Sequence, residues 1–492
     1  MNSPPQGITH LIGRFVDRLL NRRKTADQSA PVAAAGAPAR ARASAASGTP
    51  GSPARAVATQ YRAADLGMVV DGVPQSAMRT CQVLQQAGYR AYIVGGGVRD
   101  SLLGLKPKDF DVATDAEPEQ VIKLFRRSRL IGRRFQIVHV LFGRDQIEVS
   151  TFRAAQANAQ TDAHGRVLHD NVWGTIEEDS ARRDFTVNAL YYDPVAGVIA
   201  DYHDGVSDLR KRVLRMIGDP ATRYREDPVR MLRTARFAAK LGFAIEPATR
   251  EPIARLAELI HNVPPARLFD EILKLLQSGH ALQSLHQLRE QGLHHGLLPL
   301  LDVILEQAGG ERFITAALTR TDERVMAGKP ISPGFLFATL LWQQVLVRWR
   351  ERTANGEHTI PALMTAIDSV VDEQCEKMAI QKRIAADMRE IWGLQPRFER
   401  RNGRSPLRLI EHLRFRAGYD FLLLRVEAGE ADEELGRWWS AFVDGDYDER
   451  ERLLSQVPVG GAGARKRRRR KPRGDGPKDG DAARTEGRRT ED

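Results

Sequence analysis

Two aspartates separated by one residue follow a run of three glycines after about a dozen positions. The glycines occupy 95–97, and the carboxylates belong to Asp109 and Asp111. Strand side chains alternate between two faces, so both carboxylates are expected on the same face of one strand. Carboxylate oxygens bind divalent cations, and a glycine turn before a helix admits a phosphate. The stretch 91–115 therefore predicts a site for a metal ion and a phosphate group.

The residues around this pair predict the elements that position it. The apolar run 92–94 predicts a buried strand, and a short helix is expected to begin near Val98. A basic turn at 106–108 then leads into the strand that carries the aspartates. Asp100 stands where a dinucleotide-binding fingerprint needs glycine, and no Gly-Lys-Ser/Thr sequence follows the glycines as in a P-loop. The glycine turn alone and the Asp-x-Asp pair alone are both common. The two together, about a dozen residues apart, are strong evidence for a metal and phosphate site.

A two-metal site needs a third carboxylate, and the sequence offers two candidates. Glu148 lies between apolar residues in a short expected strand, and Asp184 lies in the sequence Arg-Arg-Asp-Phe. Either residue could instead be a surface carboxylate or the partner of an arginine. The residue pattern alone leaves both candidates open.

A second informative element is the helix expected in the stretch 224–241. Pro228 suits its first turn, where Asp227 also meets the positive end of the helix dipole. Arg230, Arg233 and Arg236 recur every three residues, close to one face. Such a row is usually a solvated face, but beside a metal and phosphate site it could contact a base and phosphates.

Length and charge bound the class of protein. The chain has 492 residues, 42% of them hydrophobic, and a formal net charge of +11. This size predicts two or more domains, and the charge favours nucleic acid or an acidic membrane surface as a partner. Cys81 and Cys375 are the only cysteines, so a disulfide framework is excluded and a reducing, cytosolic compartment is expected. The sequence has neither a transmembrane run nor a signal-peptide core.

Composition and hydrophobic periodicity divide the chain into six regions. The fold class is expected to be α+β, with a small mixed sheet in a head followed by an all-α neck, body and tail. The regions are an amphipathic helix at 1–24, a disordered linker at 25–69, the head at 70–205, a helical neck at 206–280, a helical body at 281–456 and a disordered basic tail at 457–492.

Both ends of the chain carry arginines with two interpretations each. The helix at 1–24 would dock on an anionic membrane or a partner protein, or pack against its own body. In the tail, a run of basic residues would contact RNA phosphates without sequence preference, or only keep the chain in solution. This run consists of Arg465, Lys466, Arg467, Arg468, Arg469, Arg470, Lys471 and Arg473.

The motifs together resemble those of the DNA polymerase β-like nucleotidyltransferases, in the family of bacterial tRNA CCA-adding enzymes and poly(A) polymerases. The resemblance covers about 72–280 strongly and 280–440 more loosely. The matching segments, in family order, are VGGGVRDSLLG, KDFDVATDA, IEVSTFR, EEDSARRDFTVNALYYD, DYHDGVSDLRKRVLRMIGDP and REDPVRMLRTARFAAKLGF.

The resemblance implies a role for each matching residue. Asp109 and Asp111 would hold catalytic Mg²⁺, and Asp184 would be the third active-site aspartate, which makes it the favoured candidate over Glu148. The positions implied to bind the nucleotide are Gly95, Gly96, Arg99, Arg183, Asp227, Arg230, Arg233 and Arg236.

The segment 130–140 separates the two branches of the family, because LIGRRFQIVHV is similar to the segment typical of the poly(A) polymerases. The implied reaction is attack of an RNA 3′-hydroxyl on ATP, as a step that promotes RNA decay. The implied partners are RNA 3′ ends and ATP, with a membrane periphery or RNA-decay proteins as further candidates and a monomer expected. The alternatives are CCA addition, which would also use CTP, and a non-catalytic RNA-binding adaptor.

Overall fold

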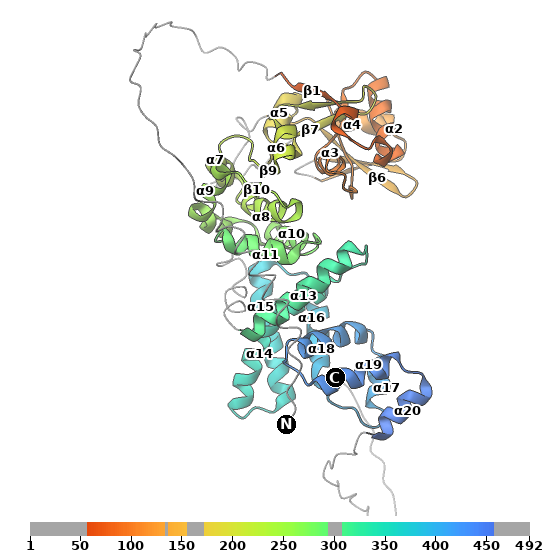
Figure 1. Ribbon diagram of the computed structural model, residues 1–492, viewed down its shortest axis with the longest axis vertical. Helices are drawn as coiled ribbons and strands as arrows, with labels where there is room; N and C mark the ends of the chain where they lie inside the picture. The colour runs from red at the N-terminus through yellow and green to blue at the C-terminus, as the bar shows by residue number, and fades with distance from the viewer. Residues whose placement is uncertain (1–56, 133–135, 155–171, 294–307, 457–492) are drawn as a thin grey trace, which may run out of the picture. The chain divides into compact units, whose positions relative to one another are not determined.

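A mixed sheet of eight strands organises the first part of the chain (Figure 1). The computed structural model describes residues 57–132, 136–154, 172–293 and 308–456. The strand order is β1-β8-β7-β2-β3-β6-β5-β4, with β3 and β6 parallel and the other neighbours antiparallel. The strands are β1 (Thr59–Arg62), β2 (Ala91–Val94), β3 (Asp111–Thr114), β4 (Ser128–Ile131), β5 (Ile137–Phe142), β6 (Asp145–Thr151), β7 (Leu190–Asp193) and β8 (Val198–Asp201).

Two helices, α2 (Gln75–Gln86) and α4 (Pro118–Leu124), pack on the strands β3 to β6. Alternate apolar residues of these strands form the core beneath them, as the period-two pattern predicts. Val138 and Val149, for example, are each at most 2% exposed. The other short helices of the head are α3 (Gly96–Leu102), α5 (Ile176–Ala181) and α6 (Gly205–Lys211). The mixed sheet expected from the sequence is confirmed.

Ordered structure begins earlier than the sequence indicated. The disordered linker was expected to reach residue 69, but β1 (Thr59–Arg62) already pairs with β8 at the edge of the sheet. Its side chains are largely exposed, so backbone hydrogen bonds rather than buried apolar area hold it. A hydrophobicity pattern could not reveal such a strand, and the linker boundary at 69 is wrong.

Beyond α6 the described chain is almost entirely helical, as expected. A two-strand pair of β9 (Val213–Leu214) and β10 (Ala244–Ile245) is the exception among these residues. The helices are α7 (Pro220–Glu226), α8 (Val229–Leu241), α9 (Pro247–Leu256), α10 (Pro265–Leu276), α11 (Ala281–Glu290), α13 (Ala308–Met326), α14 (Pro333–Ala354), α15 (Thr359–Met378), α16 (Lys382–Phe398), α17 (Ser405–Ile410), α18 (Phe415–Glu427), α19 (Glu433–Asp444) and α20 (Tyr447–Gln456).

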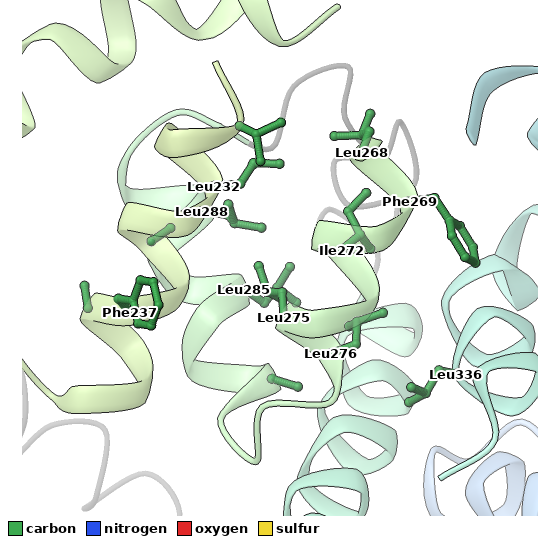
Figure 2. Close-up of a cluster of buried hydrophobic side chains, with 14 of the residues drawn as sticks. Leu232, Phe237, Leu268, Phe269, Ile272, Leu275, Leu276, Leu285, Leu288 and Leu336 are labelled. Carbon is green, nitrogen blue, oxygen red and sulfur yellow. The ribbon is translucent and has the colours of Figure 1, made fainter. Parts of the chain in front are cut away.

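A leucine-rich cluster fixes the orientation of α8 (Figure 2). Leu232 of α8 faces leucines of α10 and α11, whereas the ring of Phe237 packs against that of Phe185 in the head, and all of these side chains are buried. Full burial of one such side chain stabilises the fold by about 1.5–3 kcal/mol. Because one face of α8 is held in this way, the arginines on its other face have defined positions.

Several expectations concern residues outside the described ranges. These are the helix at 1–24, most of the linker, and the basic tail with its arginine run, all of which stay predictions. Among the residues that are described, no helix has the length and hydropathy that crossing a membrane requires.

Candidate active site

The glycine turn joins β2 to α3. The helix begins at Gly96, two residues before the expected start, and Gly95 takes a left-handed conformation with φ of 73°. A Cβ on Gly97 would lie 2.9 Å from the ring of Phe110 and 3.2 Å from the carbonyl oxygen of Asp109. Glycine at 97 therefore allows the chain that leads into β3 to approach the turn closely.

The two aspartates of the motif lie at the start of β3. Asp111 is the first residue of the strand, whereas Asp109 precedes it, so the prediction that one strand carries both is wrong by two residues. The two residues nevertheless line one cavity of about 500 Å³ together with Glu148. The structure thus brings together the pair that the sequence singled out, and adds Glu148 to it.

Glu148 is the nearest carboxylate across the sheet. It stands opposite Asp111 in the parallel register of β3 and β6, which places both side chains on one face. Burial, the charge of Glu148 and the charge of Asp109 raise the pKa of Asp111 to about 6, although Arg183 acts in the opposite direction. The three carboxylates therefore repel one another.

Asp184 lies in a different environment, bound to Arg233 of α8. Its Oδ2 accepts hydrogen bonds from Arg233 Nε at 2.9 Å and Nη2 at 2.6 Å. Its Oδ1 accepts from the Asn188 amide and from the backbone N–H of Phe185, both at 2.9 Å. Burial alone would raise the pKa of Asp184, but Arg233 and these hydrogen bonds outweigh it and lower the pKa to about 2.

The position of Asp184 differs from the one expected for a third metal-binding carboxylate. It lines a neck cavity of about 400 Å³ and not the cavities that contain Asp111. Both of its oxygens already accept two hydrogen bonds, so it is an arginine partner in this structure, the other interpretation that the sequence left open.

The two arginines expected at the triphosphate have different surroundings. Arg183 lies at the glycine turn, where a Cβ on Gly95 would be 3.5 Å from its Nη1. Its guanidinium is held by Tyr191, with Nε 2.8 Å from the hydroxyl, and by Asp179. Arg99 also lies at this turn, since a Cβ on Gly96 would be 3.4 Å from its Nη2, but it is buried and lies within 2.6 Å of Asp100. Arg183 borders the cavities, whereas Arg99 points into the interior.

The arginine row of α8 also divides. Arg230 and Arg233 line the neck cavity together with Asp227, which Arg267 contacts at 2.9 Å. Arg236 is buried and bound to Glu271 at 2.7 Å. The expectation that all three arginines form one accessible face is therefore wrong for Arg236, since α8 turns it toward α10.

One residue that the sequence did not single out connects the two regions. Arg223 of α7 is buried, and its Nη2 donates to the backbone carbonyl oxygens of Arg182 at 2.6 Å and Arg183 at 2.8 Å. Its Nη1 contacts Glu226 at 2.9 Å. Arg182 and Arg183 line both the neck cavity and a sheet cavity of about 310 Å³ that contains Asp111 and Glu148. Arg223 thus holds the segment that the two cavities share.

The carboxylates at β3 suit magnesium in their chemistry. Oxygen donors are what Mg²⁺ prefers, and the raised pKa of Asp111 marks negative charge that Arg183 offsets only in part. Within the described ranges, no three acidic, histidine or cysteine side chains are already arranged to hold a metal ion. The residues fit such an ion by charge and donor type.

Family models match three parts of the chain. "Poly A polymerase head domain" matches residues 91–215, "Probable RNA and SrmB- binding site of polymerase A" matches 242–305, and "Polymerase A arginine-rich C-terminus" matches 355–474. Together they include the sheet cavity of about 310 Å³ and the basic run of the tail, whereas α8 lies between two of the matched ranges.

Solved structures similar to this chain include a "tRNA-processing enzyme (apo form I)", with a TM-score of 0.52 at 22% identity over 78% of this chain and 98% of that one. Another is a CCA-adding enzyme, with a TM-score of 0.51 at 17% identity over 81% of this chain and 99% of that one. At this identity they show the fold, a nucleotidyltransferase head followed by helical regions.

Curated relatives are similar over most of the chain. Poly(A) polymerase I of Salmonella typhi is 44% identical over 420 residues, which is 82% of this chain and 90% of the relative. Poly(A) polymerase I of Haemophilus influenzae is 46% identical over 78% of this chain and 87% of its own length. A CCA-adding enzyme of Bacillus subtilis is 39% identical over 43% of this chain and 53% of its own length. The chain belongs to the poly(A) polymerase family of nucleotidyltransferases.

Proposed function

We propose that the chain is a template-independent poly(A) polymerase that transfers AMP from ATP to RNA 3′ ends. One observation carries this proposal: the similarity to poly(A) polymerase I continues through the head, the RNA-binding region and the arginine-rich C-terminal region. The similarity to a CCA-adding enzyme covers only 43% of the chain.

The reaction joins the 3′-oxygen of RNA to the α-phosphorus of ATP. The bond from that phosphorus to the bridging oxygen breaks, pyrophosphate leaves, and the hydroxyl proton is released to solvent. Asp109 and Asp111 would hold Mg²⁺, with Glu148 as the third carboxylate in place of Asp184. When bound, the ions lower the pKa of the attacking hydroxyl and stabilise the charge on pyrophosphate.

The chain's own residues mainly position the substrates, since phosphoryl chemistry of this kind needs alignment more than covalent help. Gly95 and Gly96 leave room for the triphosphate beside Arg183. Asp227, Arg230 and Arg233 line the neck cavity and would face the nucleoside. Arg99 and Arg236 are buried ion-pair partners, so we assign them an indirect role in holding α3 and α8.

The assay is extension of a generic RNA primer with each nucleoside triphosphate supplied separately. ATP alone should support long extension, and Asp109→Ala or Asp111→Ala should reduce it by about a thousandfold or more while the fold persists. Asp368→Ala, on the exposed surface of α15, is the matched control. Equal use of CTP would favour CCA addition, and an inactive wild-type protein would favour a non-catalytic adaptor.

RNA affinity is expected to depend on the basic run at 465–473, through phosphate contacts that release counterions. Truncation after Pro458 should flatten the plot of log affinity against log salt, by about 0.7 for each single-strand phosphate that the chain no longer neutralises. Fluorescence anisotropy with a labelled oligonucleotide measures this slope. If truncation leaves the slope unchanged, the run only solubilises the chain.

A further inference from the structure

The strands β4, β5 and β6 have one face that the core does not use. Val138 and Val140 of β5 and Ile147 and Val149 of β6 are buried on the face that packs against α2 and α4. The residues between them must point to the opposite face, because successive strand side chains alternate. That second face, here called the open sheet face, carries polar, basic and aliphatic side chains.

A row of four residues crosses the open sheet face in register. Arg129 of β4 stands opposite His139 of β5, His139 opposite Glu148 of β6, and Glu148 opposite Asp111 of β3. His139 Nε2 lies 3.5 Å from Glu148 Oε1, so these two side chains are in contact. The row spans three strand spacings, or about 14 Å. It therefore leads from a basic sheet edge directly to the catalytic carboxylates.

Two further rows flank this one. Ile131 stands opposite Ile137 on one side, and Leu141 stands opposite Gln146 on the other. Leu141 is 36% exposed. The open sheet face thus has aliphatic side chains on both sides of a polar row.

The open sheet face is continuous with the proposed site. Ile137 lines the sheet cavity of about 310 Å³ together with Asp111, Glu148 and Ser150. Any RNA whose 3′-hydroxyl reaches Asp111 must bring its preceding nucleotides across an adjoining surface. The neck cavity on the other side of Arg182 and Arg183 is the one proposed for the incoming nucleotide.

Charge indicates what the outer edge of this surface would bind. Arg126, Arg127 and Arg129 are all exposed at or just before β4, the last strand of the sheet. Three arginines at a sheet edge attract a phosphate backbone. The imidazole ring can stack on a base, and the aliphatic side chains offer an apolar surface beside it. Arginine forks suit phosphate groups in particular.

We propose that the open sheet face of β4–β6 is the track for the 3′-terminal nucleotides of the RNA primer. Arg129 and its neighbours contact backbone phosphates at the outer end, and the 3′-hydroxyl lies at Asp111 and Glu148 at the inner end. This inference rests on the proposed AMP transfer and names the surface that presents one of its two substrates.

The test is Arg129→Glu compared with Arg62→Glu. Both arginines are exposed on edge strands, Arg129 on β4 and Arg62 on β1 at the opposite edge of the same sheet. Arg129→Glu should raise the KM for a short oligo(A) primer about tenfold, because charge reversal replaces attraction to phosphate by repulsion. The KM for ATP and the melting temperature should not change. Arg62→Glu should leave both KM values unchanged.

A second measurement locates the primer directly. An oligonucleotide with a photoreactive thio-base next to its 3′ end, mixed with wild-type protein in the absence of ATP, should crosslink to peptides within 127–142. Crosslinks confined to other regions, or an Arg129→Glu variant with unchanged primer KM, would overturn the track.

The same data separate other outcomes. A rise in the KM for ATP alone would make the open sheet face part of the nucleotide site and would also refute the track. A wild-type protein that extends no primer would refute the proposed function itself, whereas an active wild-type protein insensitive to Arg129→Glu would refute only this inference.

Discussion

Asp111 and Asp184 are both largely buried carboxylates near Arg183, yet their pKa values are shifted in opposite directions. Burial and the neighbouring Glu148 and Asp109 raise the pKa of Asp111 to about 6. Burial acts the same way on Asp184, but Arg233, Asn188 and the backbone N–H of Phe185 lower its pKa to about 2. The protein compensates the charge of one and leaves the charge of the other exposed to repulsion.

This difference in pKa indicates that the carboxylates around Asp111 lack a compensating cation, whereas Asp184 already has one in the guanidinium of Arg233. Asp184 and Arg233 form a charge pair that attaches the head to α8, and such a pair needs nothing further. Asp111 shares its cavity of about 500 Å³ with three other carboxylates, those of Asp109, Asp145 and Glu148. Carboxylates that repel one another are suited to bind a metal ion. The proposed function therefore assigns nucleotide positioning to the neck cavity and the transfer step to the cavities that contain Asp111.

The largest predicted effect tests which carboxylate accompanies Asp111. Glu148→Gln keeps the shape of the side chain and removes its charge, so kcat for AMP transfer should fall about a hundredfold or more. Glu119→Gln is the control, because Glu119 is an exposed residue of α4, and this variant should have the kcat of the wild type. If Glu148→Gln retained near-normal kcat, Glu148 would not be the third metal-binding carboxylate. Asp184 would then be the remaining candidate, and the proposed difference in role between Asp111 and Asp184 would be wrong.

The second prediction concerns the free energy of unfolding, which substitution of the two aspartates by asparagine should change in opposite directions. In metal-free protein at pH 7, Asp111→Asn removes an uncompensated charge and should raise the free energy of unfolding by about 1–3 kcal/mol. Asp184→Asn removes the carboxylate that binds the part-buried Arg233, leaves it only the more distant Glu271 at 3.9 Å, and should lower the free energy of unfolding by about 3 kcal/mol. Urea unfolding of both variants measures these changes, and shifts of equal sign would contradict the assignment.

The pH dependence of the Asp111→Asn gain follows from the same shift. The pKa of Asp111 is about 6 in the folded protein and about 4 when unfolded. As pH falls through this window, the folded wild type takes up a proton before the unfolded chain does, so it gains stability. The advantage of the variant should therefore be full above pH 6 and absent below about pH 4. A gain that persisted at low pH would point to a cause other than charge.

Residue spacing predicted the parts of the site that are local in sequence. The glycine turn, the Asp-x-Asp pair and the helix after Pro228 are each fixed by a few neighbouring residues, and each is present in the structure. The short strand expected around Glu148 is also present, as β6. Local rules suffice where backbone conformation follows from side chains a few positions apart.

The relations between these segments could not be predicted in the same way. Whether Asp184 meets Asp111 or Arg233 depends on how α8 packs against the head, and Arg233 is 49 residues away. The inward turn of Arg236 depends on Glu271 of α10. An arginine row at spacing three looks the same from the sequence whether its members face solvent, a cavity or a helix.

The smallest effect is expected at Arg223, which holds the segment 182–183 that lines both the neck cavity and the sheet cavity. Arg223→Lys keeps the positive charge but loses the planar fork that binds the carbonyl oxygens of Arg182 and Arg183. We expect the KM for ATP to rise a few-fold with a smaller change in kcat, since about 1 kcal/mol of positioning is lost.

Arg225→Lys, on the exposed side of the same helix, is the matched control for Arg223→Lys. Both variants keep the charge, so a difference between them reports the hydrogen bonds alone. If Arg223→Lys lowered kcat and left the KM for ATP unchanged, the segment 182–183 would act on the metal carboxylates and not on nucleotide position. The two cavities would then belong to one catalytic unit, and the division drawn from Asp111 and Asp184 would have to be given up.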